Sequence, residues 1–123
     1  MQTADFVATV FDGKSNPAKV TVAFTMANKA LEQGRSAMVL LMVEAVELGV
    51  PGATGGMDVG APFKPVPELF AAFTGNGGRI GICSSCMIHN GFTAEQMDPA
   101  YEIVDAGAVV TLLCEARGTL PIT

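Results

Sequence analysis

The stretch AMVLLMV, which spans Ala37–Val43, is hydrophobic at every position and decides the fold class predicted for this chain. Polar Arg35 and Ser36 come directly before it, and Glu44 follows it. A short, uninterrupted apolar run between polar residues is typical of a central parallel strand that is buried on both faces. We therefore expect residues 37–43 to form a middle strand of an α/β sheet.

The residues before this strand predict a strand and a helix. Residues 5–11 are rich in β-branched and aromatic side chains, and residues 12–17, DGKSNP, are turn and cap formers. Asn16 is suited to the N-cap of a helix with Pro17 at its first position, and Gly34 supplies the C-terminal stop. Together with the apolar run, these segments predict one βαβ unit.

The later segments continue the alternation of helices and strands. A capping-box pattern at Thr93 and Gln96 predicts the start of a short helix. The other expected elements are a helix over 67–74, a strand over 79–83, a strand over 101–104, a helix over 106–117 and a strand over 119–123. Five strands and four helices predict a single α/β domain over residues 1–123, with a mostly parallel five-stranded sheet flanked by helices.

Residues 49–67 are rich in glycine and proline and predict a long irregular loop. A loop of this length can be a lid or a contact surface, or it can be a plain connection. The run GATGG at 52–56 lacks the Lys-Ser/Thr that follows in a phosphate-binding loop, so we do not expect phosphate binding there.

The composition excludes several classes of protein. Of the 123 residues, 50% are hydrophobic and only 15% are charged, and the mean hydropathy is +0.42. These values exclude intrinsic disorder. The net charge of -5 and the absence of a basic cluster argue against a nucleic-acid partner.

The chain also shows no sign of targeting or membrane insertion. Its longest apolar run, 37–43, is far shorter than the ~20 residues that a membrane-spanning helix needs. The start MQTADF has no basic segment followed by an apolar one. Three cysteines are an odd number, whereas secreted disulfide scaffolds usually hold an even, denser set. We therefore expect free thiols in a reducing cytoplasm.

We expect a homo-oligomer from the surplus of apolar surface. A monomer of this size buries only about two thirds of the surface of its unfolded chain, and few charges are available to cover the remainder. The predicted first helix has an apolar stripe wider than one sheet contact requires, which comprises Val20, Ala23, Phe24, Met26, Ala27, Ala30 and Leu31. This stripe fits a subunit interface as well as a fully packed core.

The residues suited to chemistry cluster in ICSSCMIH at 82–89, where a predicted strand ends. Ligands and reactive groups gather at the carboxyl ends of strands in open α/β sheets. The backbone N–H groups of Ser84 and Ser85 are expected to face Cys83 and to favour its thiolate, which is the nucleophilic form. Cys83 is therefore the candidate nucleophile.

Other interpretations of the cysteines remain open. Cys83 and Cys86 can be small buried hydrophobic residues, or the pair of a thiol-disulfide redox protein. Zinc binding would use Cys83, Cys86, His89 and the distant Cys114. Covalent haem attachment is excluded because Met87 stands where a histidine is needed. With a single CxxC pair, we expect neither a metal site nor a cofactor.

The stretch 62–91, followed by FTAEQM and the closing TLPIT, resembles the DsrE/DsrF-like sulfur-transfer family. The most specific part of the resemblance is GGRIGICSSC at 77–86. The resemblance implies a flavodoxin-like sheet and trimeric or hexameric assembly. It also implies that Cys83 carries sulfane sulfur as a persulfide and that Cys86 is the second cysteine found in many members.

Thiol chemistry suggests a mechanism for such a protein. The Cys83 thiolate would take the outer sulfur of a persulfide or a related sulfane compound and release it to an acceptor thiol, so donor and acceptor proteins or small compounds are the expected partners. Cys86 would attack the persulfide and free sulfide, or help to hold the thiolate, and His89 would protonate a leaving thiol. The alternative is a non-catalytic oligomer whose loop 49–67 covers a small ligand.

Overall fold

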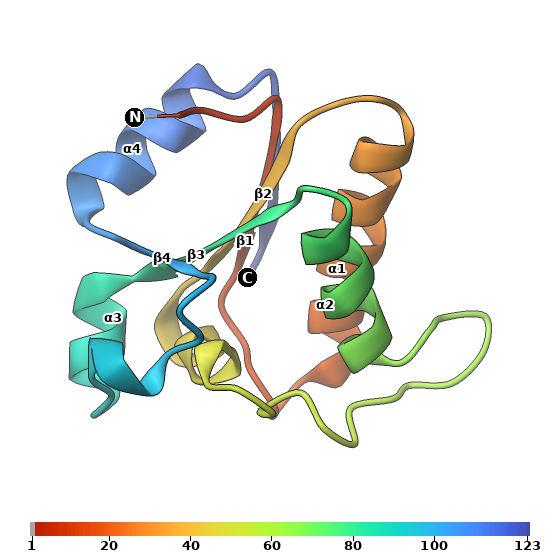
Figure 1. The fold of residues 1–123 in the computed structure, drawn as a ribbon, viewed down its shortest axis with the longest axis horizontal. Helices are drawn as coiled ribbons and strands as arrows, with labels where there is room; N and C mark the ends of the chain where they lie inside the picture. The colour runs from red at the N-terminus through yellow and green to blue at the C-terminus, as the bar shows by residue number, and fades with distance from the viewer. Residues whose placement is uncertain (1) are drawn as a thin grey trace.

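A five-stranded sheet forms the centre of the computed structural model, which describes residues 2–123 (Figure 1). Every neighbouring pair of strands is parallel, and their order across the sheet is β4-β3-β2-β1-β5. The strands are β1 Phe6–Val10, β2 Ala37–Leu41, β3 Arg79–Cys83, β4 Glu102–Val104 and β5 Gly118–Ile122. The expected five-stranded α/β sheet is confirmed, and it is parallel throughout.

The apolar run at 37–43 is the central strand, but it ends two residues earlier than expected. All residues of β2 are buried between β1 and β3. Residues Val43–Gly49 form a 3-10 helix, η1, which the sequence patterns did not predict. Ala45, Val46 and Leu48 of η1 are buried, so this short helix closes the core where the strand stops.

Helices cover both faces of the sheet (Figure 1). The helices α1 Pro17–Glu32 and α2 Val66–Gly75 lie on one face, and α4 Ala106–Glu115 covers the other. The short α3 Ser84–His89 and the 3-10 turn η2 Ala94–Gln96 lie near the carboxyl ends of the strands. Within residues 2–123, no helix is long and apolar enough to cross a bilayer.

The first helix begins and ends where its sequence predicts. The Asn16 side chain accepts a hydrogen bond from the Lys19 N–H at 3.4 Å, and Gly34 takes a positive φ of 79° after the last turn. The Phe24 ring stacks on Phe70 of α2 at a centroid distance of 3.9 Å. Of the stripe on this helix, Met26 stays 50% exposed while the alanines are buried.

The glycine- and proline-rich loop is irregular between η1 and α2, as expected. Its two ends are one or two residues shorter than predicted, because Gly49 belongs to η1 and α2 starts at Val66. The Val66 N–H donates to the Met57 carbonyl at 2.9 Å, and Met57 is buried, so the middle of the loop is attached to the core. The tip of the loop projects beyond α1 and α2 (Figure 1).

The turn before β3 admits no side chain at Gly78. A Cβ atom at this position would lie 2.5 Å from Cδ1 of the fully buried Phe73 ring. We expect Gly78→Ala to lower the free energy of unfolding by about 1–3 kcal/mol, because the packed ring must move. The matched control is Gly75→Ala, where a Cβ meets nothing within 4 Å. Urea unfolding measures both variants, and equal stabilities would contradict the prediction.

An ion pair fixes the edge strand β4 to β3. The Arg79 Nε and Nη2 atoms donate to the two carboxylate oxygens of Glu102 at 2.7 and 2.8 Å. These bonds lower the pKa of Glu102 below its ordinary value of 4.5, and partial burial opposes them more weakly. The carboxylate therefore contributes stability in full above about pH 4.5, and the contribution is lost as the pH falls through the lowered pKa.

We expect Glu102→Gln to destabilise the protein at about pH 7 and to have a smaller effect at about pH 3, because the advantage of the wild-type carboxylate shrinks as the pH falls below 4.5 toward its lowered pKa. Denaturant unfolding at both pH values measures the difference. Glu32→Gln is the control, since the Lys29–Glu32 pair is more than half exposed on both sides and contributes little. A Glu102→Gln effect that is the same at both pH values would show that the ion pair is not responsible.

Candidate functional site

Cys83 is the last residue of β3 and lies at the carboxyl edge of the sheet. The chain turns there directly into α3, and η1 packs beside α3 at the same edge (Figure 1). The Cys83 side chain is only 7% exposed. Cys83 therefore lies at the end of the strand where the sequence predicted it.

The expected contact between Cys83 and the N–H groups that follow it is not present. Cys83 occupies the N-cap position of α3 with an extended backbone, yet its side chain accepts no capping hydrogen bond. A thiol is a weak hydrogen-bond acceptor, and the Cys83 side chain is almost fully buried. The expectation that the N–H groups of Ser84 and Ser85 bond to the Cys83 sulfur is therefore wrong for this structure.

Cys86 lies in the first turn of α3, is partly buried, and is the thiol that neighbours Cys83. Burial is the largest influence on Cys86 and raises its pKa, and the neighbouring Cys83 thiol raises it further. The backbone N–H of Val43 donates to the Cys86 sulfur and opposes this rise. The net shift is upward from the ordinary 9.0, so Cys86 is a protonated thiol at neutral pH.

Asn90 connects the two segments that surround Cys86. Its Nδ2 atom donates to the Cys86 carbonyl at 2.7 Å and to the Val43 carbonyl at 3.1 Å. Neither Asn90 nor Val43 was among the residues predicted for the site. The Asn90-Gly91 pair signals the end of a helix, but no sequence pattern predicts a positive φ at a valine.

The other two candidates lie away from this pair. His89 is exposed at the last position of α3, and no side-chain hydrogen bond of the described residues involves it. Cys114 is exposed on α4, which covers one face of the sheet rather than its carboxyl edge. In the part of the chain that the structure describes, no three His, Cys, Asp or Glu residues are grouped to hold a metal ion.

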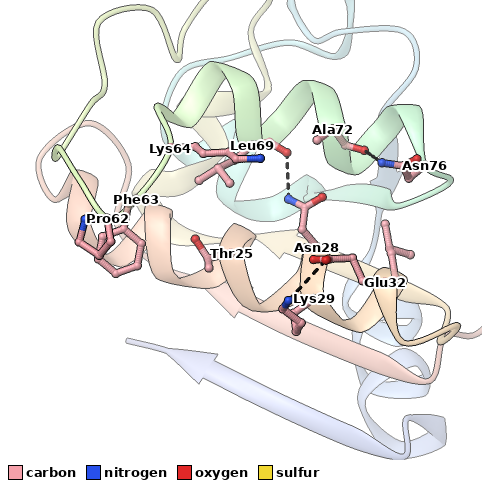
Figure 2. Close-up of a pocket in the computed structure, with 11 residues that line it drawn as sticks. Thr25, Asn28, Lys29, Glu32, Pro62, Phe63, Lys64, Leu69, Ala72 and Asn76 are labelled. Atoms are coloured by element: carbon pink, nitrogen blue, oxygen red, sulfur yellow. Dashed lines mark hydrogen bonds and ion pairs between the residues drawn. The ribbon is translucent and has the colours of Figure 1, made fainter.

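A groove in the surface lies away from the thiol pair. Figure 2 shows a groove of about 650 Å³ between α1, α2 and residues 62–64. The Asn28 Nδ2 atom donates a hydrogen bond to the Leu69 carbonyl at 3.1 Å. The Lys29 Nζ atom forms an ion pair with Glu32 Oε1 at 3.4 Å. No cysteine or histidine lines this groove. The groove therefore takes no part in thiol chemistry, and the pair Cys83 and Cys86 is the candidate site.

Comparison with solved structures supports the fold. The ychN protein from E. coli superposes with a TM-score of 0.76 at 16% identity, with 98% of this chain and 99% of that chain covered. MTH1491 from Methanobacterium thermoautotrophicum, described as a protein of unknown function, superposes with a TM-score of 0.65 at 13% identity, with 94% and 97% covered. No curated protein sequence matches the chain.

The comparison with family models identifies the chain. The model of the DsrE/DsrF-like family matches residues 5–120, which run from the start of β1 into β5 and include Cys83 and Cys86. The match covers nearly the whole chain, and it agrees with the flavodoxin-like arrangement of a parallel sheet between helices. This protein therefore belongs to the DsrE/DsrF-like family.

Proposed function

We propose that this protein carries sulfane sulfur as a persulfide on Cys83. The observation that supports the proposal most directly is the position of Cys83 at the carboxyl end of β3, with the second thiol, Cys86, one helical turn further on. Membership of the DsrE/DsrF-like family supports the same assignment. All three cysteines are free thiols, as persulfide chemistry requires, and a reducing cytoplasm is the compartment that we propose.

The transfer is a thiol exchange with no net oxidation. The Cys83 thiolate attacks the outer sulfur of a donor persulfide, the donor S–S bond breaks, and the donor leaves as a thiolate that takes up a proton. An acceptor thiolate then attacks the outer sulfur of Cys83–S–SH and regenerates the Cys83 thiolate. Because Cys83 is only 7% exposed, the donor sulfur must lie at the end of a narrow group, such as a protein persulfide or a small sulfane compound.

Cys86 and His89 have supporting roles in this proposal. Cys86 is protonated at neutral pH, so it can donate a proton to a leaving thiolate beside Cys83. It can also lose its proton and attack the inner sulfur of the Cys83 persulfide, which frees sulfide and forms a Cys83–Cys86 disulfide. His89 lies at the exposed end of α3, and in this proposal it gives a proton to a thiolate that leaves toward solvent.

Thiol-disulfide exchange is the second candidate function, and the contact between the two thiols favours it. Cys83 raises the pKa of the Cys86 thiol, which indicates that the two thiols are neighbours. A redox protein would cycle between the dithiol and the disulfide and would not accumulate extra sulfur. Mass spectrometry of the protein after exposure to polysulfide therefore separates the two functions.

We expect Cys83→Ser to abolish sulfur loading, because the hydroxyl cannot form a persulfide, and to leave the fold intact because the volume changes little. Peptide mass spectrometry after incubation with polysulfide detects the added sulfur. Cys114→Ser is the matched control, an identical change at an exposed cysteine on α4, and it should load like the wild type.

Cys86→Ser should keep loading but slow the release of sulfide, because the second thiol is lost. Loading of Cys83→Ser at the wild-type rate would contradict the carrier assignment. Disulfide formation in the wild type without any added sulfur would instead support the redox function.

We further propose that the protein assembles into trimers or hexamers. Met26 is 50% exposed on α1, and it borders a shallow apolar hollow together with Phe6 and Leu120. This surface fits the wide stripe of the first helix and is suited to a second copy of the chain.

We expect light scattering at micromolar concentration to give three or six times the 12.7 kDa chain mass. Met26→Lys should shift the protein toward the monomer if α1 forms the contact, because the interface would have to bury a charge. Val110→Lys is the control on α4, where the side chain is 59% exposed. A wild-type mass near 12.7 kDa would contradict the proposed assembly.

A further inference from the structure

Val43 has an unusual backbone conformation directly beside the thiol pair. Its φ is +53°, and among residues 2–123 it is the one residue other than glycine with a positive φ. The left-handed region is unfavourable for a β-branched residue, because its branched Cβ crowds the backbone. Strain of this kind persists only where surrounding contacts hold the residue in place, and it is common at functional sites.

The contacts that hold Val43 come from two directions. On the sheet side, the N–H of the preceding Met42 donates to the Val10 carbonyl at 2.9 Å and continues the β1–β2 pairing. On the other side, the Asn90 amide donates to the Val43 carbonyl at 3.1 Å. The chain just before Val43 and the chain just after it are thus attached to different elements, and the strained φ lies between these attachments.

Both backbone groups of Val43 bond to the segment that carries the thiols. The carbonyl accepts from Asn90, and the backbone N–H side of Val43 favours the Cys86 thiolate. Asn90 also binds the Cys86 carbonyl at 2.7 Å, so one side-chain amide joins Val43 to the turn of α3 that contains Cys86. If Asn90 is removed, nothing on α3 holds the Val43 carbonyl, so the strained φ of Val43 can relax and change the direction of its N–H.

We propose that Asn90 is a positioning residue that holds the strained Val43 backbone with its N–H directed at the Cys86 sulfur, and that it thereby sets the reactivity of the second thiol. An N–H aimed at sulfur stabilises the thiolate. Other titratable groups on the elements packed here are Cys83, His89, Glu44 and Glu47, and of these only Cys83 acts on the Cys86 thiol.

This inference concerns Cys86, and its consequence for sulfur release rests on the proposed function. In a loaded protein, the Cys86 thiolate forms a bond to the Cys83 sulfur, the bond to the outer sulfur breaks, and the electron pair leaves with hydrosulfide. The resulting Cys83–Cys86 disulfide is then reduced by two equivalents of a small thiol. A Val43 N–H that favours the Cys86 thiolate accelerates the first of these steps.

The chain offers a matched control for Asn90. Asn76 follows α2 as Asn90 follows α3, and its Nδ2 atom makes the same bond to the carbonyl four residues earlier, to Ala72 at 2.8 Å. Asn76 has no second bond to a distant segment. Asn90→Ala and Asn76→Ala therefore both remove a helix-end bond, but only Asn90→Ala releases Val43.

The test is alkylation of the folded protein with iodoacetamide over a range of pH, with each cysteine followed by peptide mass spectrometry. We expect Asn90→Ala to move the Cys86 profile to higher pH and to slow its alkylation near pH 8 by about 3- to 10-fold. This corresponds to a rise of about half to one unit in the pKa of the Cys86 thiol. Cys114 is the internal reference and should not change. Asn76→Ala should leave the Cys86 profile as in the wild type.

Two further variants separate positioning from a merely structural role. Glycine adopts a positive φ without strain, so Val43→Gly should make Asn90 less necessary, and Val43→Gly combined with Asn90→Ala should recover much of the lost Cys86 reactivity. Loss of a helix cap alone would not be rescued in this way. Asn90→Leu keeps a similar size, has no N–H to donate and adds no charge, so it gives the same comparison if Asn90→Ala does not fold.

A Cys86 profile that is unchanged or shifted to lower pH in folded Asn90→Ala or Asn90→Leu would overturn the inference, as would the absence of rescue by Val43→Gly. Alkylation requires no sulfur donor, so these results stand even if Cys83 fails to load sulfur. With loading confirmed, sulfide release from polysulfide-treated Asn90→Ala should slow by a similar factor. Normal release from a variant with slowed Cys86 alkylation would overturn the consequence for sulfur transfer.

Discussion

The burial of β2 on both faces is the constraint on which the rest of this structure depends. Its residues are all buried and apolar, so the strand must pair along both edges and be covered above and below. β1 and β3 supply the pairing, in parallel, and parallel neighbours require crossover connections. Those connections place α1 and α2 on one face, and α4 from the later crossover covers the other. The carboxyl edge of the sheet is then left to the short helices η1 and α3.

The chain must leave β2 at that edge without exposing the core, and this requirement links the fold to the site. Three buried side chains of η1, including Val46, cover the end of the sheet directly after the strand stops. To begin η1 there, the backbone turns sharply at Val43 through a conformation that a valine adopts only when it is held. The same turn directs a backbone N–H toward Cys86. The residue that terminates the central strand therefore also contributes to the environment of a thiol more than forty residues later in the chain.

Two opposing effects decide the chemistry of the second thiol. Burial and the neighbouring Cys83 keep the proton on Cys86, whereas the Val43 N–H favours its loss. Burial dominates, so Cys86 is a protonated thiol at neutral pH. The attachment of Val43 to α3 through Asn90 makes this balance depend on two hydrogen bonds of 2.7 and 3.1 Å. Reactivity at this edge is thus controlled by the relative position of two backbone segments.

Sequence patterns by themselves determined the order and type of the main elements, because buried strands, capped helices and turn residues carry local signals. Asn16, Pro17 and Gly34 mark the first helix, and the apolar run at 37–43 marks the central strand. The Cys83–Cys86 pair was also recognisable, because its spacing and its place after a strand are local features. Only the tertiary structure decided that the run ends at Leu41 and that Cys83 has no capping bond. It likewise decided that Val43 and Asn90 surround Cys86, because such contacts join residues far apart in the chain, and no local preference encodes them.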